Sequence, residues 1–158
     1  VMGRDDDLFL LSTTHGYGFV CRFADMVTRK KNGKALISLA RGAQLLPPAA
    51  VDDPAHQQIV AITSSGYIGV IPLGEIPQLA KGKGNKIQGI PPGRIKAGEE
   101  WIAFIACLSG KQKLVIHCGK KYKTMNLKEL EDYRIERGKR GRKLPRGYQN
   151  VSAVEVID

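Results

Sequence analysis

Residues 59–71 read Ile-Val-Ala-Ile-Thr-Ser-Ser-Gly-Tyr-Ile-Gly-Val-Ile, which is an apolar run, a turn that contains glycine, and a second apolar run. Short runs rich in Val and Ile on either side of such a turn predict two antiparallel strands. Gly66 supplies the positive φ angle that a tight hairpin turn requires. The stretch therefore predicts a hairpin, and it is the clearest sign of an all-β fold in the chain.

The same module occurs three times: two apolar runs around a glycine turn, then a loop rich in Gly, Lys and Arg. The turn glycines Gly16, Gly66 and Gly119 lie 50 and 53 residues apart. A period of that size is typical of propeller blades or solenoids. We place the three repeats at approximately residues 5–50, 56–107 and 111–158, within a single domain over residues 1–158. Because a closed propeller needs about four or more blades, we expect the chain to be part of a longer polypeptide.

The composition is that of a globular domain, with 42% hydrophobic and 25% charged residues in 158. No run approaches the roughly 20 apolar residues of a membrane helix, and the acidic residues 5–7 are unlike the basic start of a signal peptide. We therefore expect a soluble, intracellular protein. Cys21, Cys107 and Cys118 lack Cys-x-x-Cys spacing, which favours free thiols over a disulfide framework or a metal site.

The net charge of +10 is concentrated near the end of the sequence. Residues 111–158 hold thirteen basic and six acidic groups, and so supply +7 of the +10. A basic bias of this kind favours nucleic acid or another anionic surface as the partner.

Three stretches, residues 15–21, 33–37 and 77–87, resemble the C-terminal domain of the A subunit of bacterial type IIA topoisomerases. They read His-Gly-Tyr-Gly-Phe-Val-Cys, Gly-Lys-Ala-Leu-Ile and Pro-Gln-Leu-Ala-Lys-Gly-Lys-Gly-Asn-Lys-Ile. The resemblance covers nearly the whole chain, and it is far more specific than charge or period alone.

Within this family the chain is most similar to the topoisomerase IV branch. Gyrase carries a box Gln-Arg-Arg-Gly-Gly-Lys-Gly in its first blade, and none of the three loops reproduces it. Residues 29–35, Arg-Lys-Lys-Asn-Gly-Lys-Ala, are a degenerate version. Since the family has five or six blades, three copies indicate the C-terminal part of the domain.

The resemblance implies a β-pinwheel, a propeller-like disc of four-stranded antiparallel blades that exchange strands, with about three blades present. It implies a non-catalytic module whose basic rim binds and bends duplex DNA and helps to select the transported segment during decatenation and supercoil relaxation. The parent would be an ATP-dependent topoisomerase that uses ATP and Mg²⁺ in other domains. It would assemble with a second A subunit and two B subunits, whereas this fragment would be a monomer.

The implied location is the bacterial cytoplasm, in association with the nucleoid, and the parent could also associate peripherally with the membrane. We expect no cofactor and no metal in the fragment itself. No pairing of a nucleophile with a base supports a catalytic site in this chain.

Lys and Arg that contact phosphates hold a duplex with little sequence preference. Glycines in the basic loops would let backbone N–H groups approach phosphate oxygens. The third loop has the most charge, so we expect it to hold DNA most firmly. The residues that we expect to line the DNA path are Arg29, Lys30, Lys31, Lys34, Lys81, Lys83, Lys86, Arg137, Lys139, Arg140, Arg142, Lys143 and Arg146.

Other interpretations remain open. A lysine-rich loop is often only a solvated turn, and the basic loops could instead grip an acidic protein partner on a propeller-like scaffold, or bind RNA. Tyr17, Tyr67 and Tyr122 recur at one place in the module, where we expect them to pack between blades rather than stack on bases. We expect Trp101 in the core. Residues 120–123 contain three lysines that suit an exposed strand edge.

Overall fold

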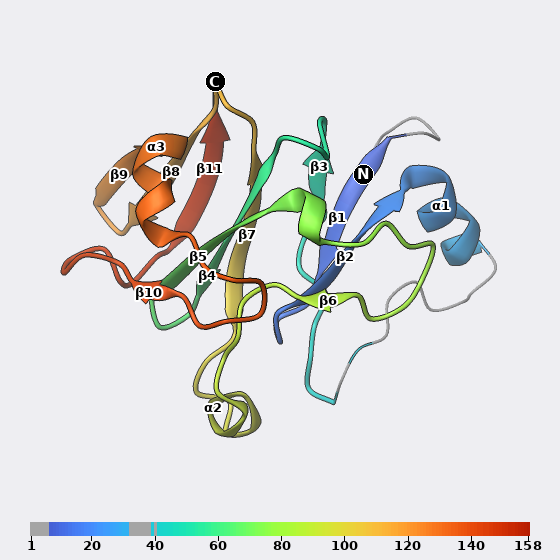
Figure 1. Ribbon diagram of the computed structural model, residues 1–158. Helices are drawn as coiled ribbons and strands as arrows, with labels where there is room; N and C mark the ends of the chain where they lie inside the picture. Colours follow the sequence, from blue (N-terminus) through green and yellow to red (C-terminus); the bar gives the residue numbers. More distant parts are fainter. Residues whose placement is uncertain (1–6, 32–38, 40) are drawn as a thin grey trace.

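The computed structural model describes residues 7–31, 39 and 41–158. Three β-sheets stand side by side (Figure 1), with strand orders β3-β1-β2-β6, β10-β5-β4-β7 and β11-β8-β9. All the pairings in these sheets are antiparallel. In the described part of the chain, no helix is long and apolar enough to cross a membrane.

Each sheet is built around a hairpin with a glycine turn. Gly16, Gly66 and Gly119 have φ angles of 95°, 85° and 65°, so the turns have the positive φ that the sequence predicted. The first sheet contains β1 (Leu8–Ser12), β2 (Tyr17–Arg22), β3 (Ala49–Val51) and β6 (Asn85–Lys86). The second contains β4 (Gln58–Thr63), β5 (Tyr67–Pro72), β7 (Ile102–Leu108) and β10 (Arg142–Lys143). The third contains β8 (Lys113–Cys118), β9 (Lys121–Asn126) and β11 (Ala153–Ile157).

Short helices lie between the strands. They are α1 (Phe23–Lys31), the 3₁₀ turn η1 (Leu73–Glu75), α2 (Pro92–Lys96), α3 (Leu127–Leu130) and the 3₁₀ turn η2 (Glu131–Tyr133). Asn126 caps α3, accepting a hydrogen bond from the Glu129 backbone N–H at 2.9 Å. The helix α2 projects away from the sheets at one end of the second sheet (Figure 1).

Two strands cross from one copy of the module to the sheet of the copy before it. The basic loop of the second copy supplies β6, which pairs with β2 so that Lys86 stands opposite Tyr17. The loop of the third copy supplies β10, which pairs with β5 so that Lys143 stands opposite Tyr67. This exchange, with two four-stranded sheets and one three-stranded sheet, confirms the predicted pinwheel arrangement of blades.

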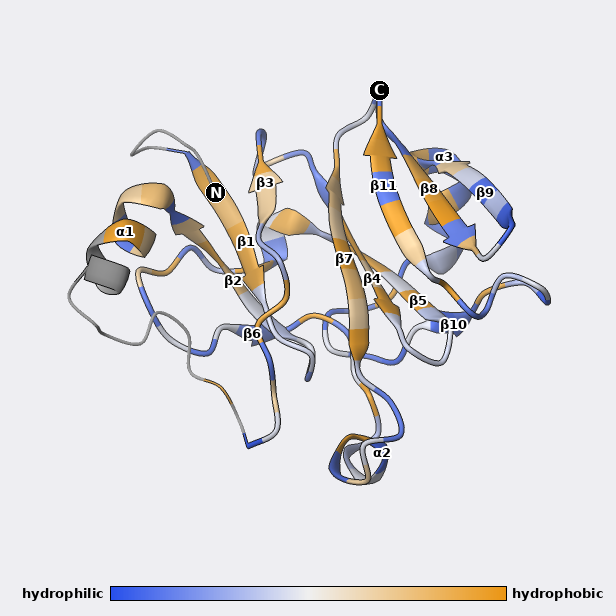
Figure 2. Ribbon diagram, turned by 180° about the vertical axis from the view of Figure 1, so that it is seen from behind, coloured by the Kyte–Doolittle hydropathy of each residue, from blue (hydrophilic) through white to orange (hydrophobic). Residues whose placement is uncertain are grey.

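The core lies both within and between the sheets. Figure 2 shows apolar strands in the middle of the sheets and hydrophilic residues on β6 and β10. One buried cluster joins Val60 of β4 to Leu114 of β8 and to Leu144, which follows the third loop. Because residues from two sheets and from the crossing loop share one core, apolar burial holds neighbouring blades together. All three cysteines are free, as predicted, and Cys21 and Cys107 are buried.

The structure differs from the sequence predictions at residues 29–31 and at Trp101. Residues 29–31 belong to the last turn of α1, not to a loop, because no Gly or Pro interrupts the chain from Phe23 to Lys31. Trp101 is not a core residue, since 45% of it is exposed.

Candidate nucleic-acid interface

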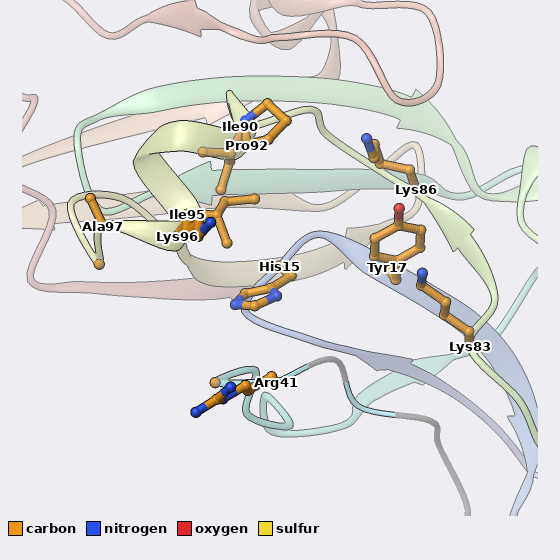
Figure 3. A pocket seen from close by; sticks show the side chains of 12 residues that line it. His15, Tyr17, Arg41, Lys83, Lys86, Ile90, Pro92, Ile95, Lys96 and Ala97 are labelled. Atoms are coloured by element: carbon orange, nitrogen blue, oxygen red, sulfur yellow. The ribbon is translucent and has the colours of Figure 1, made fainter.

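A groove of about 870 Å³ opens beside the first hairpin. Its walls come from four places in the chain: the β1–β2 hairpin, the segment at residues 41–42, the second basic loop with β6, and the region around α2. Figure 3 shows Arg41 and α2 on opposite sides of His15. The lining residues are His15, Tyr17, Arg41, Gly42, Lys83, Lys86, Ile90, Pro92, Ile95, Lys96, Ala97 and Gly98.

Four cations and no carboxylate occur among these lining residues. Arg41, Lys83 and Lys96 are exposed, and Lys86 is half-buried. No carboxylate of the described chain forms an ion pair with any of the four. The groove is therefore a site of uncompensated positive charge, which suits an anionic ligand.

The Tyr17 ring anchors the two lysines that come from the second copy. Lys83 Nζ lies 4.2 Å from the ring centroid and Lys86 Nζ lies 5.7 Å from it, and Figure 3 shows the ring between the two side chains. Both are cation–π distances. The π face restrains the lysines but carries no formal charge, so their full charge faces the groove.

An equivalent joint links the second and third copies. Here Arg140 lies 3.7 Å from the centroid of the Tyr67 ring, and Lys143 Nζ lies 5.8 Å from it. Tyr67 therefore corresponds to Tyr17, and Arg140 corresponds to Lys83. The two joints share one geometry because each basic loop adds an edge strand beside the tyrosine of the preceding blade.

The second joint contains a buried carboxylate that the first lacks. The Glu100 side chain is fully buried, and Arg140 donates to it through Nη2 at 2.8 Å and Nη1 at 3.2 Å. Arg94 of α2 donates to the same carboxylate through Nε at 2.8 Å. Burial by itself would raise the pKa of Glu100, but hydrogen bonds from Arg140, Thr63 and Arg94 outweigh it and lower the pKa. Glu100 thus stays ionised, and its negative charge offsets the positive charge of Arg140.

Comparison with known proteins gave relatives in one family. No family model matches the chain. The A subunit of DNA topoisomerase 4 from Pseudomonas aeruginosa is 41% identical over 96% of the chain, and that from Haemophilus influenzae is 36% identical over all of it. The solved E. coli ParC C-terminal domain matches 99% of the chain with a TM-score of 0.83 at 36% identity. The chain is a homologue of the C-terminal region of ParC, the A subunit of DNA topoisomerase IV.

The match covers only part of each relative. The chain spans about a fifth of the length of these topoisomerase IV subunits (20% and 21%) and 63% of the solved ParC domain. A solved DNA gyrase A C-terminal domain is similar in fold, with a TM-score of 0.68 at 15% identity. Together these likenesses confirm the predicted topoisomerase IV resemblance and the β-pinwheel fold.

The residues that sequence reasoning placed on the DNA path have different surroundings in this topoisomerase IV homologue. Lys34 lies outside the described residues, and the side chains of residues 29–31 are not described. Most of the others are exposed: Lys81, Lys83, Arg137, Lys139, Arg142, Lys143 and Arg146. Lys86 and Arg140 are half-buried. Arg140 thus belongs to an ion pair between blades rather than to a set of free cations.

Two groove cations, Arg41 and Lys96, were absent from the sequence-based set. Arg41 follows the first basic loop and Lys96 follows the second, outside the clusters of Lys and Arg from which that set was chosen. Their one sequence signal was a basic residue next to a Gly or Pro turn, at Arg41-Gly42 and at residues 91–96. Only the fold shows that these two segments meet the second basic loop.

The loop glycines also have a different setting from the one expected. A Cβ at Gly84 would collide with the backbone oxygen of Gly18, and one at Gly141 would lie 2.5 Å from the backbone oxygen of Ile68. These glycines let the crossing loops lie against a neighbouring strand. The close approach that requires glycine at these two positions is therefore to protein backbone.

The tyrosines divide between two environments. Tyr17 and Tyr67 lie half-buried at the joints between blades, as the packing prediction expected. Tyr122 is 65% exposed on β9, so that prediction is wrong for the third copy. Lys120, Lys121 and Lys123 fall on or beside β9, an edge strand of the third sheet, which confirms the predicted edge position.

Proposed function

We propose that this chain is a non-catalytic module that binds and bends duplex DNA. The observation that carries the proposal is the basic groove between the first and second copies, with four cations and no acidic residue in its lining. The homology to DNA topoisomerase IV, an enzyme named for its action on DNA, agrees with this chemistry.

Binding would depend mainly on phosphates. Each phosphate that Lys or Arg neutralises releases a condensed counterion, which favours binding strongly at low salt and weakly at high salt. The third loop also carries exposed cations, at Arg137, Lys139 and Arg142. This loop begins beside the groove, where Arg137 donates to the Lys86 backbone oxygen at 3.2 Å, and a duplex that continues along it would pass from one blade to the next. Bending a site of about 20–30 base pairs costs on the order of 1–6 kcal/mol, which several phosphate contacts offset.

The wider setting is part of the same proposal. In the whole protein, strand cleavage, ATP hydrolysis and the use of Mg²⁺ would reside outside this chain. The protein would assemble with a second A subunit and two B subunits on the nucleoid. This module would then position the DNA segment that is transported during decatenation and supercoil relaxation.

The proposal is tested by the salt dependence of binding to a duplex of about 30 base pairs. The four groove cations alone predict a slope of log affinity against log salt of about −3.6, at about −0.9 per contact. A slope near zero, or equal affinity for an acidic protein of similar charge, would overturn the proposal. A single strand of the same length serves as the control, and we expect it to bind more weakly.

A further inference from the structure

The two equivalent joints differ in the charge that surrounds the cation over the tyrosine ring. At the second joint, Arg140 and Arg94 both donate to Glu100 at 2.8 Å, so its one negative charge offsets one of their two positive charges. At the first joint, Lys83 is restrained by the Tyr17 ring alone, at 4.2 Å. The groove lining at the first joint contains no carboxylate that would offset its lysines, whereas Glu100 offsets part of the charge at the second joint.

The groove brings further cations to the first joint from distant parts of the sequence. Arg41 comes from the segment that precedes β3, and Lys96 is the last residue of α2. Arg94, also on α2, donates to Glu100 and to Ser65 Oγ at 3.1 Å. Glu100 thus fixes the helix that carries Lys96, and the wall of the groove is in place before any ligand arrives. Such preorganisation lowers the entropic cost of binding.

The groove also continues towards Trp101. A smaller hollow of about 240 Å³ shares His15, Gly42, Ile95 and Gly98 with the groove. It is lined in addition by Thr14, Gln44, Trp101 and the buried, arginine-paired Glu100. Trp101 is the only tryptophan of the chain, and it is exposed. An anionic polymer that lies in the groove would pass close to this indole.

We infer that this groove is the main phosphate-binding site of the module, and that Arg41 and Lys96 contact the phosphodiester backbone of duplex DNA together with Lys83 and Lys86. The inference rests on the proposed function and assigns it to a particular place. The open shape and cationic walls of the groove suit a polymer backbone that enters at one end and leaves at the other. Free phosphate has the same chemistry but only one group to offer.

The test uses the 158-residue chain with the double variant Arg41→Ala/Lys96→Ala. The matched control is Lys111→Ala/Lys113→Ala, which removes the same charge from two exposed residues outside the groove. At about 0.1 M salt, losing two contacts should lower affinity for duplex DNA by up to about 60-fold and reduce the salt slope by about 1.8. The control variant should lose only the small amount of affinity that follows from its lower net charge. Circular dichroism checks that both variants are folded.

Fluorescence of Trp101 provides an independent readout. Duplex DNA should change the emission of the wild-type chain and of the control variant, and should leave that of Arg41→Ala/Lys96→Ala nearly unchanged at equal DNA concentration. Equal losses of affinity in the two variants, or full binding without any change in Trp101 emission, would overturn the inference while the proposed function stands. Failure of the wild-type chain to bind duplex would overturn both.

Competition with inorganic phosphate distinguishes a site for the phosphates of duplex DNA from a site for free phosphate. At constant ionic strength, millimolar phosphate should compete weakly with duplex and cause no comparable change in Trp101 emission. Full displacement of the duplex by phosphate at that concentration would show a small-anion site instead, and would contradict the inference.

Discussion

At the scale of single residues, Glu100 and Tyr17 have opposite effects on neighbouring cations. The Glu100 carboxylate offsets one of the two positive charges of the arginines beside it, whereas the Tyr17 ring restrains two lysines without cancelling their charge. Neither role could be predicted from the sequence. Glu100 contacts Arg140, which is forty residues away along the chain, and nothing local to Glu99-Glu100 distinguishes the buried carboxylate from the exposed one.

Replacing Glu100 should destabilise the fold. Glu100→Ala leaves Arg140 without its counterion in a partly buried site and leaves Arg94 with only its long pair to Glu99, so we expect a loss of about 3 kcal/mol, the lower end of the range for breaking a buried ion pair. Urea unfolding measures it. The neighbouring change Glu99→Ala is the control, because Glu99 is exposed and its pair with Arg94 is long, at 3.5 Å. We expect less than about 1 kcal/mol for that change. Equal effects of the two changes would show that the Glu100 network is unimportant.

The same carboxylate should make stability depend on pH. The pKa of Glu100 in the folded protein is below its ordinary value of 4.5. Its contribution is therefore fully present above about pH 4.5 and is lost as the pH falls through the lower folded-state value. The difference in unfolding free energy between the wild type and Glu100→Gln should be constant from about pH 6 to about pH 5 and should shrink at lower pH. A difference that grows on acidification would contradict the assigned direction.

At the scale of elements, turns and strands were predictable and their partners were not. Gly66 and the apolar runs around it are local signals, and β4 and β5 form the hairpin that they predicted. The crossing strands β6 and β10 contain only two residues each, with a sequence typical of a solvated loop. Their pairing depends on the shape of the previous blade. In the same way, the charge of residues 29–31 suggested a loop, but these residues end α1, because Gly33 comes only after them in the sequence.

A test of the crossing strands is the substitution Gly84→Ala. Gly84 has a φ of 79°, and a Cβ there would meet the backbone of Gly18 on β2. We expect destabilisation by more than about 1 kcal/mol in thermal or urea unfolding. The control is Gly93→Ala in α2, where a Cβ meets nothing within 4 Å and φ is not positive. That change should be neutral or slightly stabilising. If the two glycines tolerated alanine equally, the close packing of β6 against β2 would be in doubt.

At the scale of the whole molecule, the repeated module predicted the arc of blades and the existence of basic loops, but not how charge is shared among them. The sequence shows the most charge in its last third, whereas the fold brings an arginine of that region onto a buried carboxylate. It also brings Arg41 and Lys96 to the second basic loop. Electrostatic potential depends on such neighbours, so a count of charges along the chain does not show how many cations are paired with carboxylates.

The most direct test of the central claim is the affinity of the chain for duplexes of increasing length, from about 10 to about 40 base pairs, at fixed salt. Contacts at the groove and along the third loop predict that affinity rises with length until the duplex spans both, and that end-labelled long duplexes show bending by energy transfer. An affinity per site that is already at its maximum on the shortest duplex, with no bending of the longest, would contradict the claim that this module holds DNA along an arc.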